Sequence, residues 1–475
     1  MPRFSEFFRL NASQAQLDFV DIDTDSDLPV YVDPYAIEIR NDVWSGSASE
    51  DIRTFFKEVL GAIRAKDLRR AQNLMSHLHE PMETFLGVSS GIPKGKGVGS
   101  QQSLQLIKGI KRSKAYKSGL LTDLSEMALY VDGVDRDKIS DLTTNVIRSK
   151  LVQYTKQQCD LYSIPLSDYN GPPLWDSQNN NWISQIVKLP FINEAPVLLV
   201  PKFAVRRRLS LDSDVFYKKQ ITDFLVAENL DANSSLVSTL KGGKKKVFKG
   251  DVRKKHKKSK GLIAEMVEKH PGLLEVYKKI AKETGMLVNF DDQDPSVAQV
   301  CVELEERLLA TPSGSIDADK YHMIAMGILT TCFYPDWVNP HKEWSINDGR
   351  KRIDIVYTNA AETGFFSHRR DAPNTAATMI IVECKNYSSK INNPEIDQLL
   401  GRFDDNRGNF GIMTCRELDD NRSAVKKCKD LAKAKRGYII ILTDKDLVEI
   451  LRAKAAQNEK AIENIFDTKF REIIS

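Results

Sequence analysis

Apolar side chains recur at three- and four-residue intervals along much of the first 205 residues. The clearest case is the segment 50–66, where this spacing predicts an amphipathic helix. Similar spacing predicts helices near 68–78 and 139–159, whereas the short apolar run at 28–33 is typical of a strand that ends at a proline turn. We therefore expect residues 1–205 to form an α-rich module.

The segment 206–260 changes from mixed to strongly basic. After a helix predicted near 216–228, residues 241–260 contain eleven Lys and Arg and one Asp, a local charge of +10. The whole chain carries +4, so the other residues sum to 4 − 10 = −6. Because the run also has three glycines and few apolar residues, we expect 206–260 to be a basic linker.

Beyond this segment, the pattern predicts three helices, which are followed by alternating strands and helices. The three helices are expected near 261–284, 296–309 and 318–332. After them, short apolar runs alternate with amphipathic segments to the end of the chain. This order favours a mixed α/β domain, with its leading helices, over residues 261–475.

Length and composition limit the class of protein. The chain has 475 residues, enough for two or three domains, and its 41% hydrophobic and 28% charged residues are typical of globular proteins. No apolar run approaches the ~18 residues that span a bilayer, and the first residues lack a signal-peptide core, so we expect no membrane partner. Six cysteines without a Cys-x-x-Cys pair favour a reducing, cytoplasmic location over a disulfide framework or a zinc ribbon.

Two strands predicted in the C-terminal part carry charges where buried strands usually have none. In the first, Arg352–Tyr357, the two isoleucines and the tyrosine share one face and Asp354 points to the other. In the second, Met379–Lys385, an apolar run leads into Glu383 and Lys385, which share a face. Ionisable groups at the end of such a run are costly unless they pair or bind something.

Metal-assisted hydrolysis of a phosphodiester requires this combination of groups. Asp354 and Glu383, on neighbouring strands, can share a hard cation such as Mg²⁺, with Mn²⁺ as a substitute, because these ions take oxygen ligands. The ion activates the attacking water and neutralises charge on the phosphate. Lys385 would orient or help deprotonate that water and stabilise the pentavalent phosphorus.

A helix expected after the second strand adds two polar candidates. Asn393 suits the N-cap and Pro394 the first helical position, and an apolar stripe follows. Gln398 and Arg402 lie one turn apart on the other side of this helix, where they can face the metal site or the substrate backbone.

The order of Asp354, the tripeptide Glu383-Cys384-Lys385 and Gln398 resembles the motif of the PD-(D/E)xK nuclease superfamily, the restriction-endonuclease-like fold. The segment 348–354 is similar to the Mrr-like branch of that superfamily. The resemblance covers residues 318–450 and implies a central mixed sheet flanked by helices. It also implies that the Asp and Glu bind the metal, that the Lys is catalytic, and that the Gln positions a ligand or the Lys.

Two features depart from compact members of this superfamily. The spacing from Asp354 to Glu383 is 383 − 354 = 29 residues, longer than in compact members. We interpret the extra stretch, 359–375, as an inserted loop that contacts substrate. Many members also carry an acidic residue on the helix before the first strand. The helix predicted near 318–332 has none at its centre. Either Glu306 or Glu343 could replace it, although both also suit ordinary surface positions.

The charged features also have ordinary structural interpretations. Glu383 and Lys385 alone are compatible with an ion pair at a strand end, but the upstream Asp354 and the helix that carries Gln398 favour a nuclease. The basic run is compatible with a solvated linker or a sorting signal. Beside a nuclease we favour contact with nucleic-acid phosphates through counterion release. The candidate nucleic-acid-binding residues are Arg402 and the basic residues Lys244, Lys245, Lys246, Lys249, Arg253, Lys254, Lys255, Lys257 and Lys258.

We therefore expect a cytoplasmic α/β (α+β) protein in two parts. An α-rich module, for sensing, partner binding or homo-oligomerisation, precedes a Mg²⁺-dependent nuclease whose substrate is double-stranded DNA. Fusion of such a module to a nuclease suggests restriction or anti-phage defence in bacteria. The alternatives are a catalytically inactive nucleic-acid-binding or scaffolding subunit of a defence complex, and an RNA nuclease.

Overall fold

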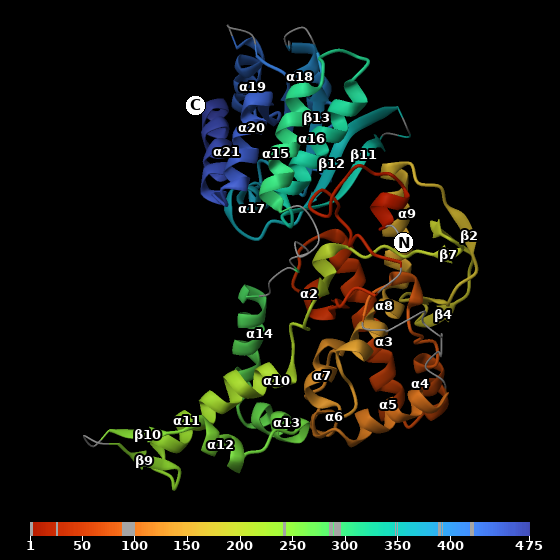
Figure 1. Ribbon diagram of the computed structural model, residues 1–475, viewed down its shortest axis with the longest axis vertical. Helices are drawn as coiled ribbons and strands as arrows, with labels where there is room; N and C mark the ends of the chain where they lie inside the picture. The colour runs from red at the N-terminus through yellow and green to blue at the C-terminus, as the bar shows by residue number, and fades with distance from the viewer. Residues whose placement is uncertain are drawn as a thin grey trace.

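The computed structural model describes residues 3–24, 27–87, 100–240, 244–284, 288, 296–346, 348, 350–387, 391, 393–418 and 422–475. The fold is mixed α/β and contains two hydrophobic cores, which lie in the lower and upper parts of Figure 1. The first core is formed mainly by residues 4–281, and the second mainly by residues 300–473. The chain therefore folds around two centres, as expected, but the boundary between them differs from the predicted one.

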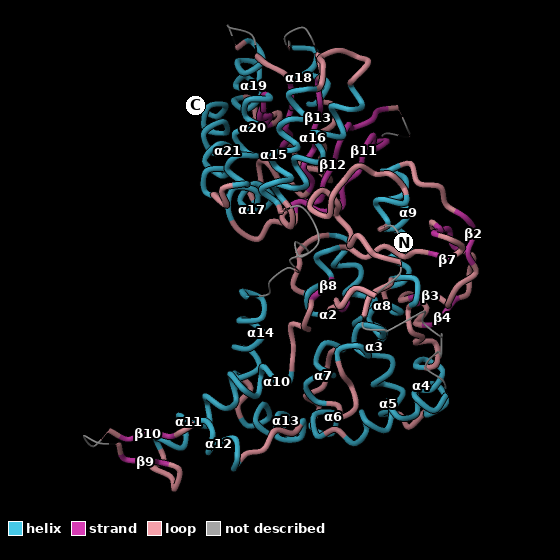
Figure 2. The backbone as a smooth tube through the Cα atoms, viewed as in Figure 1, coloured by secondary structure: helices cyan, strands magenta, loops and turns pink. Residues whose placement is uncertain are grey.

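The N-terminal module is largely helical, and its strands are short and paired in twos (Figure 2). Its helices are α1 (Phe4–Phe7), α2 (Pro34–Glu38), α3 (Val43–Arg64), α4 (Leu68–Met75), α5 (Ser100–Arg112), α6 (Lys114–Ser118), α7 (Met127–Tyr130), α8 (Arg136–Val146) and α9 (Arg148–Tyr162), with 3-10 turns η1 (Met82–Thr84), η2 (Leu124–Glu126) and η3 (Lys202–Ala204). Its strands are β1 (Tyr31–Val32), β2 (Ser167–Tyr169), β3 (Leu174–Asp176), β4 (Asn181–Ile183), β5 (Val187–Leu189), β6 (Phe191–Ile192), β7 (Ala195–Pro196) and β8 (Val205–Arg206).

The longest helix of this module, α3, covers most of the segment predicted from the apolar spacing at 50–66 and ends at Arg64. It begins earlier, because Asp42 accepts a hydrogen bond from the Ser45 amide at 2.9 Å and so caps a helix whose first residue, Val43, lies seven positions before residue 50. The segment predicted as one helix over 139–159 is two helices, α8 and α9, which meet at Ile147.

The segment expected to be a basic linker is folded, so that prediction is wrong. It contains α10 (Ser213–Val215), the π-helix η4 (Phe216–Ile221), α11 (Thr222–Asp231), the hairpin of β9 (Val237–Thr239) and β10 (Lys245–Val247), and α12 (Lys249–Lys255). Val247 and Val252 are buried and anchor the hairpin and α12 to the first core. Two buried valines are enough to attach this segment to the core, because its lysines remain at the surface and need no burial. We call residues 237–240 and 244–258 the basic arm; it extends to the lower left in Figure 1.

Helices α13 (Lys260–Lys269) and α14 (Gly272–Thr284) belong to the first core and do not lead the C-terminal domain. Ile263 and Val267 are buried against this core, and the Tyr277 ring stacks on Phe216 with centroids 4.6 Å apart. The predicted boundary at residue 261 is therefore wrong, because α13 packs on α6 and α7 of the N-terminal module and α14 packs on α13 and η4.

The C-terminal domain is a five-stranded sheet flanked by helices, as expected. Its helices are α15 (Val297–Ala310), α16 (Ala318–Phe333), α17 (Gly364–Asp371), α18 (Asn393–Leu400), α19 (Ser423–Lys433), α20 (Asp444–Ala455) and α21 (Glu459–Ile474). Its strands are β11 (Trp337–Ile346), β12 (Lys351–Asn359), β13 (Met379–Lys385), β14 (Phe410–Cys415) and β15 (Tyr438–Thr443).

The sheet order follows the chain, β11-β12-β13-β14-β15, and its pairing changes direction at β13. The pairs β11–β12 and β12–β13 are antiparallel, and the pairs β13–β14 and β14–β15 are parallel. Helix α16 packs across β11, β12 and β13, whereas α19 and α21 pack against β15. Strand β13 is thus the central strand, covered on both faces, and it carries the two charged residues of interest.

The two cores meet where α16 passes into β11. Val338 of β11 belongs to the first core, and the carbonyl of Pro335 accepts a hydrogen bond from Arg40 at 3.0 Å. The Lys202 ammonium lies 4.2 Å from the centre of the Tyr334 ring. The N-terminal module therefore holds one end of α16, the helix whose other end reaches the candidate site described below.

Candidate active site

The end of β13 carries two ionisable side chains into the protein interior. Glu383 is 0% exposed and Lys385 is 6% exposed, and both lie on the same face of the strand. Strand β12 pairs with β13 from Thr358–Met379 to Ile355–Val382. The next step of that register puts Asp354 opposite Glu383. The Asp354 carboxylate accepts a hydrogen bond from the Cys384 amide at 2.9 Å, which fixes it at the point where the ladder ends.

A hydrogen-bonded triangle joins this strand end to helix α18. The Lys385 ammonium donates to Oε1 of Glu383 at 2.9 Å and to Oε1 of Gln398 at 3.0 Å. The Gln398 amide in turn donates to Oε1 of Glu383 at 2.5 Å. The structure therefore brings together four residues chosen from the sequence, Asp354, Glu383, Lys385 and Gln398.

One atom of this cluster is left without a partner. Oε2 of Glu383 is buried and accepts no hydrogen bond within the described part of the chain. A buried carboxylate oxygen in this state costs free energy, and such atoms in native proteins commonly contact an ion or a water. Oε2 is therefore an acceptor that a cation or a hydrogen-bond donor could still occupy.

The electrostatics of the cluster are set by burial and by mutual proximity. Burial raises the pKa of Glu383, the nearby Asp354 carboxylate raises it further, and Lys385 and Arg402 oppose this rise. Burial alone would lower the pKa of Lys385, but the Glu383 carboxylate outweighs it, so the pKa of Lys385 is raised. Lys385 is therefore a cation at neutral pH and acts as a donor.

His322 of α16 lies beside this cluster and was missed in the sequence. Its Nε2 is 3.8 Å from Oδ2 of Asp354 and 3.3 Å from the carbonyl oxygen of Cys384. A single histidine on a helix has no spacing signal, so only the packing of α16 on β13 reveals it. The acidic residues considered for this place lie elsewhere, because Glu343 pairs with Arg352 at 3.2 Å on the surface and Glu306 is exposed on α15.

The donor set is compatible with Mg²⁺. No group of three or more His, Cys, Asp and Glu that could hold a metal occurs among the described residues. Mg²⁺ does not require one, since it binds through one or two carboxylates and keeps several waters. Asp354 and the free Oε2 of Glu383 supply two carboxylates whose mutual repulsion a cation would relieve.

Of the candidate nucleic-acid-binding residues, Arg402 lies near the carboxylate cluster and the others lie far from it. Arg402 follows α18 and lies close enough to Glu383 to act on its pKa, and its Nε is buried without a partner in the described part of the chain. The basic arm lies at the opposite end of the molecule from β13 and α18 (Figure 1). Its lysines are therefore not part of the carboxylate cluster.

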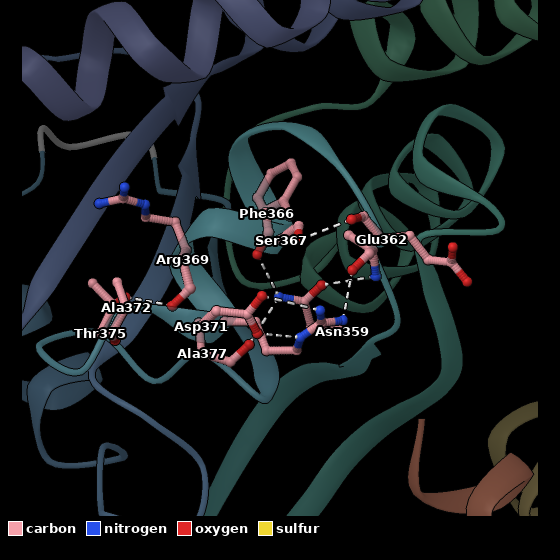
Figure 3. Close-up of polar contacts among 11 residues, drawn as sticks. Asn359, Glu362, Phe366, Ser367, Arg369, Asp371, Ala372, Thr375 and Ala377 are labelled. Carbon is pink, nitrogen blue, oxygen red and sulfur yellow. Dashed lines mark hydrogen bonds and ion pairs between the residues drawn. The ribbon is translucent and has the colours of Figure 1, made fainter. Parts of the chain in front are cut away.

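The stretch expected to be an inserted loop is a structural element of the second core. Residues 364–371 form α17, and Phe365 and Phe366 are buried in that core. The Asn359 amide donates to the carbonyl of Phe366 at 3.0 Å and to that of Ala377 at 2.8 Å, which closes the base of the insertion (Figure 3). The insertion leaves β12 and enters β13 at the strand ends opposite to the site, so it is not part of the carboxylate cluster.

Comparison with known proteins found similarity in the N-terminal part of the chain. A family model described as a domain of unknown function (DUF8370) matches residues 9–212. No curated protein and no solved structure matches the chain. The matched segment lies within the first core and contains none of the residues of the carboxylate cluster.

No helix in the described part of the chain is both long and apolar enough to cross a membrane.

Proposed function

We propose that this protein is a Mg²⁺-dependent nuclease of the restriction-endonuclease-like class that hydrolyses phosphodiester bonds of DNA. The observation that carries the proposal is the unpartnered Oε2 of Glu383, which is buried beside Asp354 and next to a lysine held as a cation. Two carboxylates and an ammonium at a strand end are the groups needed to bind a metal and a phosphate together.

In the mechanism we propose, Asp354 and Glu383 hold the ion, which when bound supplies charge neutralisation and an activated water. Lys385 has three N–H donors, two of which Glu383 and Gln398 occupy. The third is available for an oxygen of the scissile phosphate, where a cation stabilises the charge that develops. Gln398 holds the ammonium in place because its amide bonds both other members of the triangle.

The basic arm supports a nucleic-acid substrate. Several of its cations form ion pairs, such as Lys249 with Asp223 at 2.5 Å and Lys258 with Asp214 at 3.0 Å. Of the other exposed cations, Lys245 bonds to Asn233 and Lys246 lies over the Phe248 ring. Four have no ion pair, side-chain hydrogen bond or ring contact in the described part of the chain, namely Lys244, Arg253, Lys255 and Lys257. Since the arm is distant from β13, we propose that it binds the phosphate backbone of the same DNA away from the cut.

The N-terminal module is proposed to regulate cutting by sensing or by binding a partner or a second copy, in a bacterial defence setting. Its support is the contact of this module with the Tyr334 end of α16, the helix that carries His322 beside Asp354. A bacterial strain that produces the wild-type protein should plate phage less efficiently than one that produces Glu383→Gln. Equal plating efficiencies would contradict the defence role.

The experiment that tests the proposed activity is cleavage of supercoiled plasmid DNA with 5'-labelled RNA of matched length in a parallel reaction. We expect Mg²⁺-dependent nicking and linearisation of DNA by the wild type, loss of cleavage with a chelator, and loss with Glu383→Gln. Glu306→Gln is the matched control, since this carboxylate is exposed on α15 and should cut like the wild type. Equal cleavage by Glu383→Gln would overturn the catalytic assignment, cleavage of RNA alone would overturn the substrate, and DNA binding without cleavage would indicate a binding protein.

A further inference from the structure

A short loop before α16 is fastened to the residue that follows Lys385. The side-chain amide of Asn386 donates to the carbonyls of Pro312 at 3.0 Å and Gly314 at 2.9 Å, and the Asn386 carbonyl accepts from the Gly314 amide at 2.7 Å. Asn386 itself is only 3% exposed. The loop 311–317 is therefore held by three hydrogen bonds to the end of β13.

Two further contacts hold this loop at its ends. Arg416, which follows β14, donates to the carbonyl of Thr311 at 2.7 Å. At the other end the loop passes directly into α16, whose first turn is tied to β11 by a bond from Lys342 to Asp319 at 3.2 Å. A loop held at both ends and in its middle presents its outward side chains in a defined position.

The outward side chain at the tip of this loop is strongly apolar. Ile316 is 96% exposed, more than any other large hydrophobic residue in the described part of the chain. On the other side of Asn386, Tyr387 is 42% exposed, and the Lys385 ammonium lies 5.6 Å from the centre of its ring. The C-terminal domain has five exposed large hydrophobic residues among those described, and these two lie on segments next to Asn386; the others are Val302, Leu309 and Ile474. Tyr387 follows Asn386 in the chain, and Ile316 lies two residues after Gly314, which is bonded to it.

Chain geometry limits how far Ile316 lies from the catalytic lysine. Consecutive Cα atoms are about 3.8 Å apart, so Ile316 is at most about 8 Å from Gly314, which is bonded to Asn386. The Cα atoms of Ile316 and Lys385 are then at most about 18 Å apart, or about five steps of a DNA strand at ~3.4 Å each. A phosphate bound at Lys385 therefore brings the neighbouring base pairs within reach of the loop.

We propose that Ile316, together with Tyr387, forms an apolar wedge that inserts between base pairs of duplex DNA next to the scissile phosphate. This inference rests on the proposed nuclease function and adds how the substrate is held. Apolar side chains inserted at a base step unstack and kink the duplex, and an aromatic ring can stack on a base. Kinking at this place exposes the backbone to Lys385. An isolated exposed isoleucine needs no explanation, but this one is fixed beside the carboxylate cluster and has an aromatic neighbour.

Unwinding of plasmid DNA tests the wedge without knowledge of a target sequence. The Glu383→Gln protein, which does not cut, is bound to plasmid that a topoisomerase then relaxes, and the topoisomers are counted. Each inserted wedge unwinds the duplex, so we expect a shift in linking number that falls at least threefold in Glu383→Gln/Ile316→Ser. Glu383→Gln/Leu309→Ser is the matched control, because Leu309 is 61% exposed on α15, and it should shift like Glu383→Gln alone.

The companion measurement is cleavage by the single variants. Ile316→Ser should lower kcat/KM for plasmid cleavage about tenfold and leave the melting temperature unchanged, since the side chain contacts solvent. If the Glu383→Gln protein does not bind DNA and the wild type does not cut it, the proposed function fails and the wedge fails with it. If the wild type cuts DNA, Ile316→Ser cuts it equally well, and Glu383→Gln/Ile316→Ser unwinds it as much as Glu383→Gln, the wedge is wrong and the nuclease assignment stands.

Discussion

Replacing Glu383 by glutamine should abolish stabilisation of the C-terminal domain by Mg²⁺ and leave its stability without metal nearly unchanged. The exchange turns two charge-assisted hydrogen bonds to Oε1, from Lys385 at 2.9 Å and from Gln398 at 2.5 Å, into bonds to a neutral oxygen, a loss of about 1 kcal/mol each. It also removes a buried carboxylate whose Oε2 is unpartnered, a burden of about 1–3 kcal/mol. The two effects have opposite signs and similar size, so we expect a net change within about 1 kcal/mol.

We expect the effect of the metal on the wild type to be much larger than this net change. An ion that binds only the folded state at a concentration 100 times its Kd stabilises that state by about 2.7 kcal/mol. Because Asp354 alone would remain as a carboxylate ligand in Glu383→Gln, most of this stabilisation should disappear. The prediction therefore separates a metal ligand from a residue that merely packs in the core.

Hydrogen–deuterium exchange of the β13–β14 amides, with and without saturating Mg²⁺, measures the opening free energy of this domain. Glu306→Gln serves as the control and should respond to Mg²⁺ like the wild type. If Glu383→Gln keeps the full response to Mg²⁺, the metal assignment is wrong. If Glu383→Gln lowers the opening free energy by more than about 3 kcal/mol without metal, the weakened hydrogen bonds and the removed buried charge do not balance as we expect.

Four further outcomes are expected. Changing the four unpaired arm cations, Lys244, Arg253, Lys255 and Lys257, together to alanine should reduce the slope of log K against log salt for binding to duplex DNA by about 3.6, at ~0.9 per phosphate contact. An unchanged slope would show that the arm does not contact the DNA. His322→Ala should weaken Mn²⁺ binding by calorimetry about tenfold, because Asp354 loses a neighbour that orients it, and His322→Asn should restore part of the loss. Ile263→Ala should cost about 2–5 kcal/mol in exchange protection of the N-terminal helices but not of β13; equal loss in both would contradict the revised boundary. Burial lowers the pKa of Lys202 to about 8, so between pH 8 and 10.5 the unfolded chain holds a proton that the folded chain has lost. The free energy of unfolding should therefore rise over this range by roughly 3 kcal/mol more in the wild type than in Lys202→Met. Parallel pH profiles of the two proteins would refute this.

The alternation of apolar and charged residues along two short segments was enough to identify the carboxylate cluster. A strand places every second side chain on one face, so Glu383 and Lys385 had to share a face and Asp354 had to leave the face of its isoleucines. The helical spacing after β13 likewise placed Gln398 on the polar side of α18, and the structure bonds it to Lys385 at 3.0 Å. These relations are local, so the order of residues determines them.

The allocation of helices to cores was decided by packing between distant segments. The periodicity of α13 and α14 shows that each has an apolar face, but not which surface covers it, and the structure packs α13 on α6 and α7 and α14 on α13 and η4. In the basic arm the charge of the lysines concealed Val247 and Val252, two buried residues that fix the hairpin and α12. Composition averages over a segment, whereas a fold can depend on a few anchoring side chains.

The sequence by itself determined that Glu383 and Lys385 share one face of a strand and that Asp354 leaves the face of its isoleucines, because alternation along a strand is a property of the backbone. Only the tertiary structure decided what surrounds them. The register of β12 on β13 brings Asp354 to Glu383, His322 reaches Asp354 because α16 crosses β13, and the loop that carries Ile316 is held to Asn386, the residue after Lys385. All three depend on contacts between residues about 30 to 75 positions apart, which carry no periodic signal and form only when strands and helices pack together.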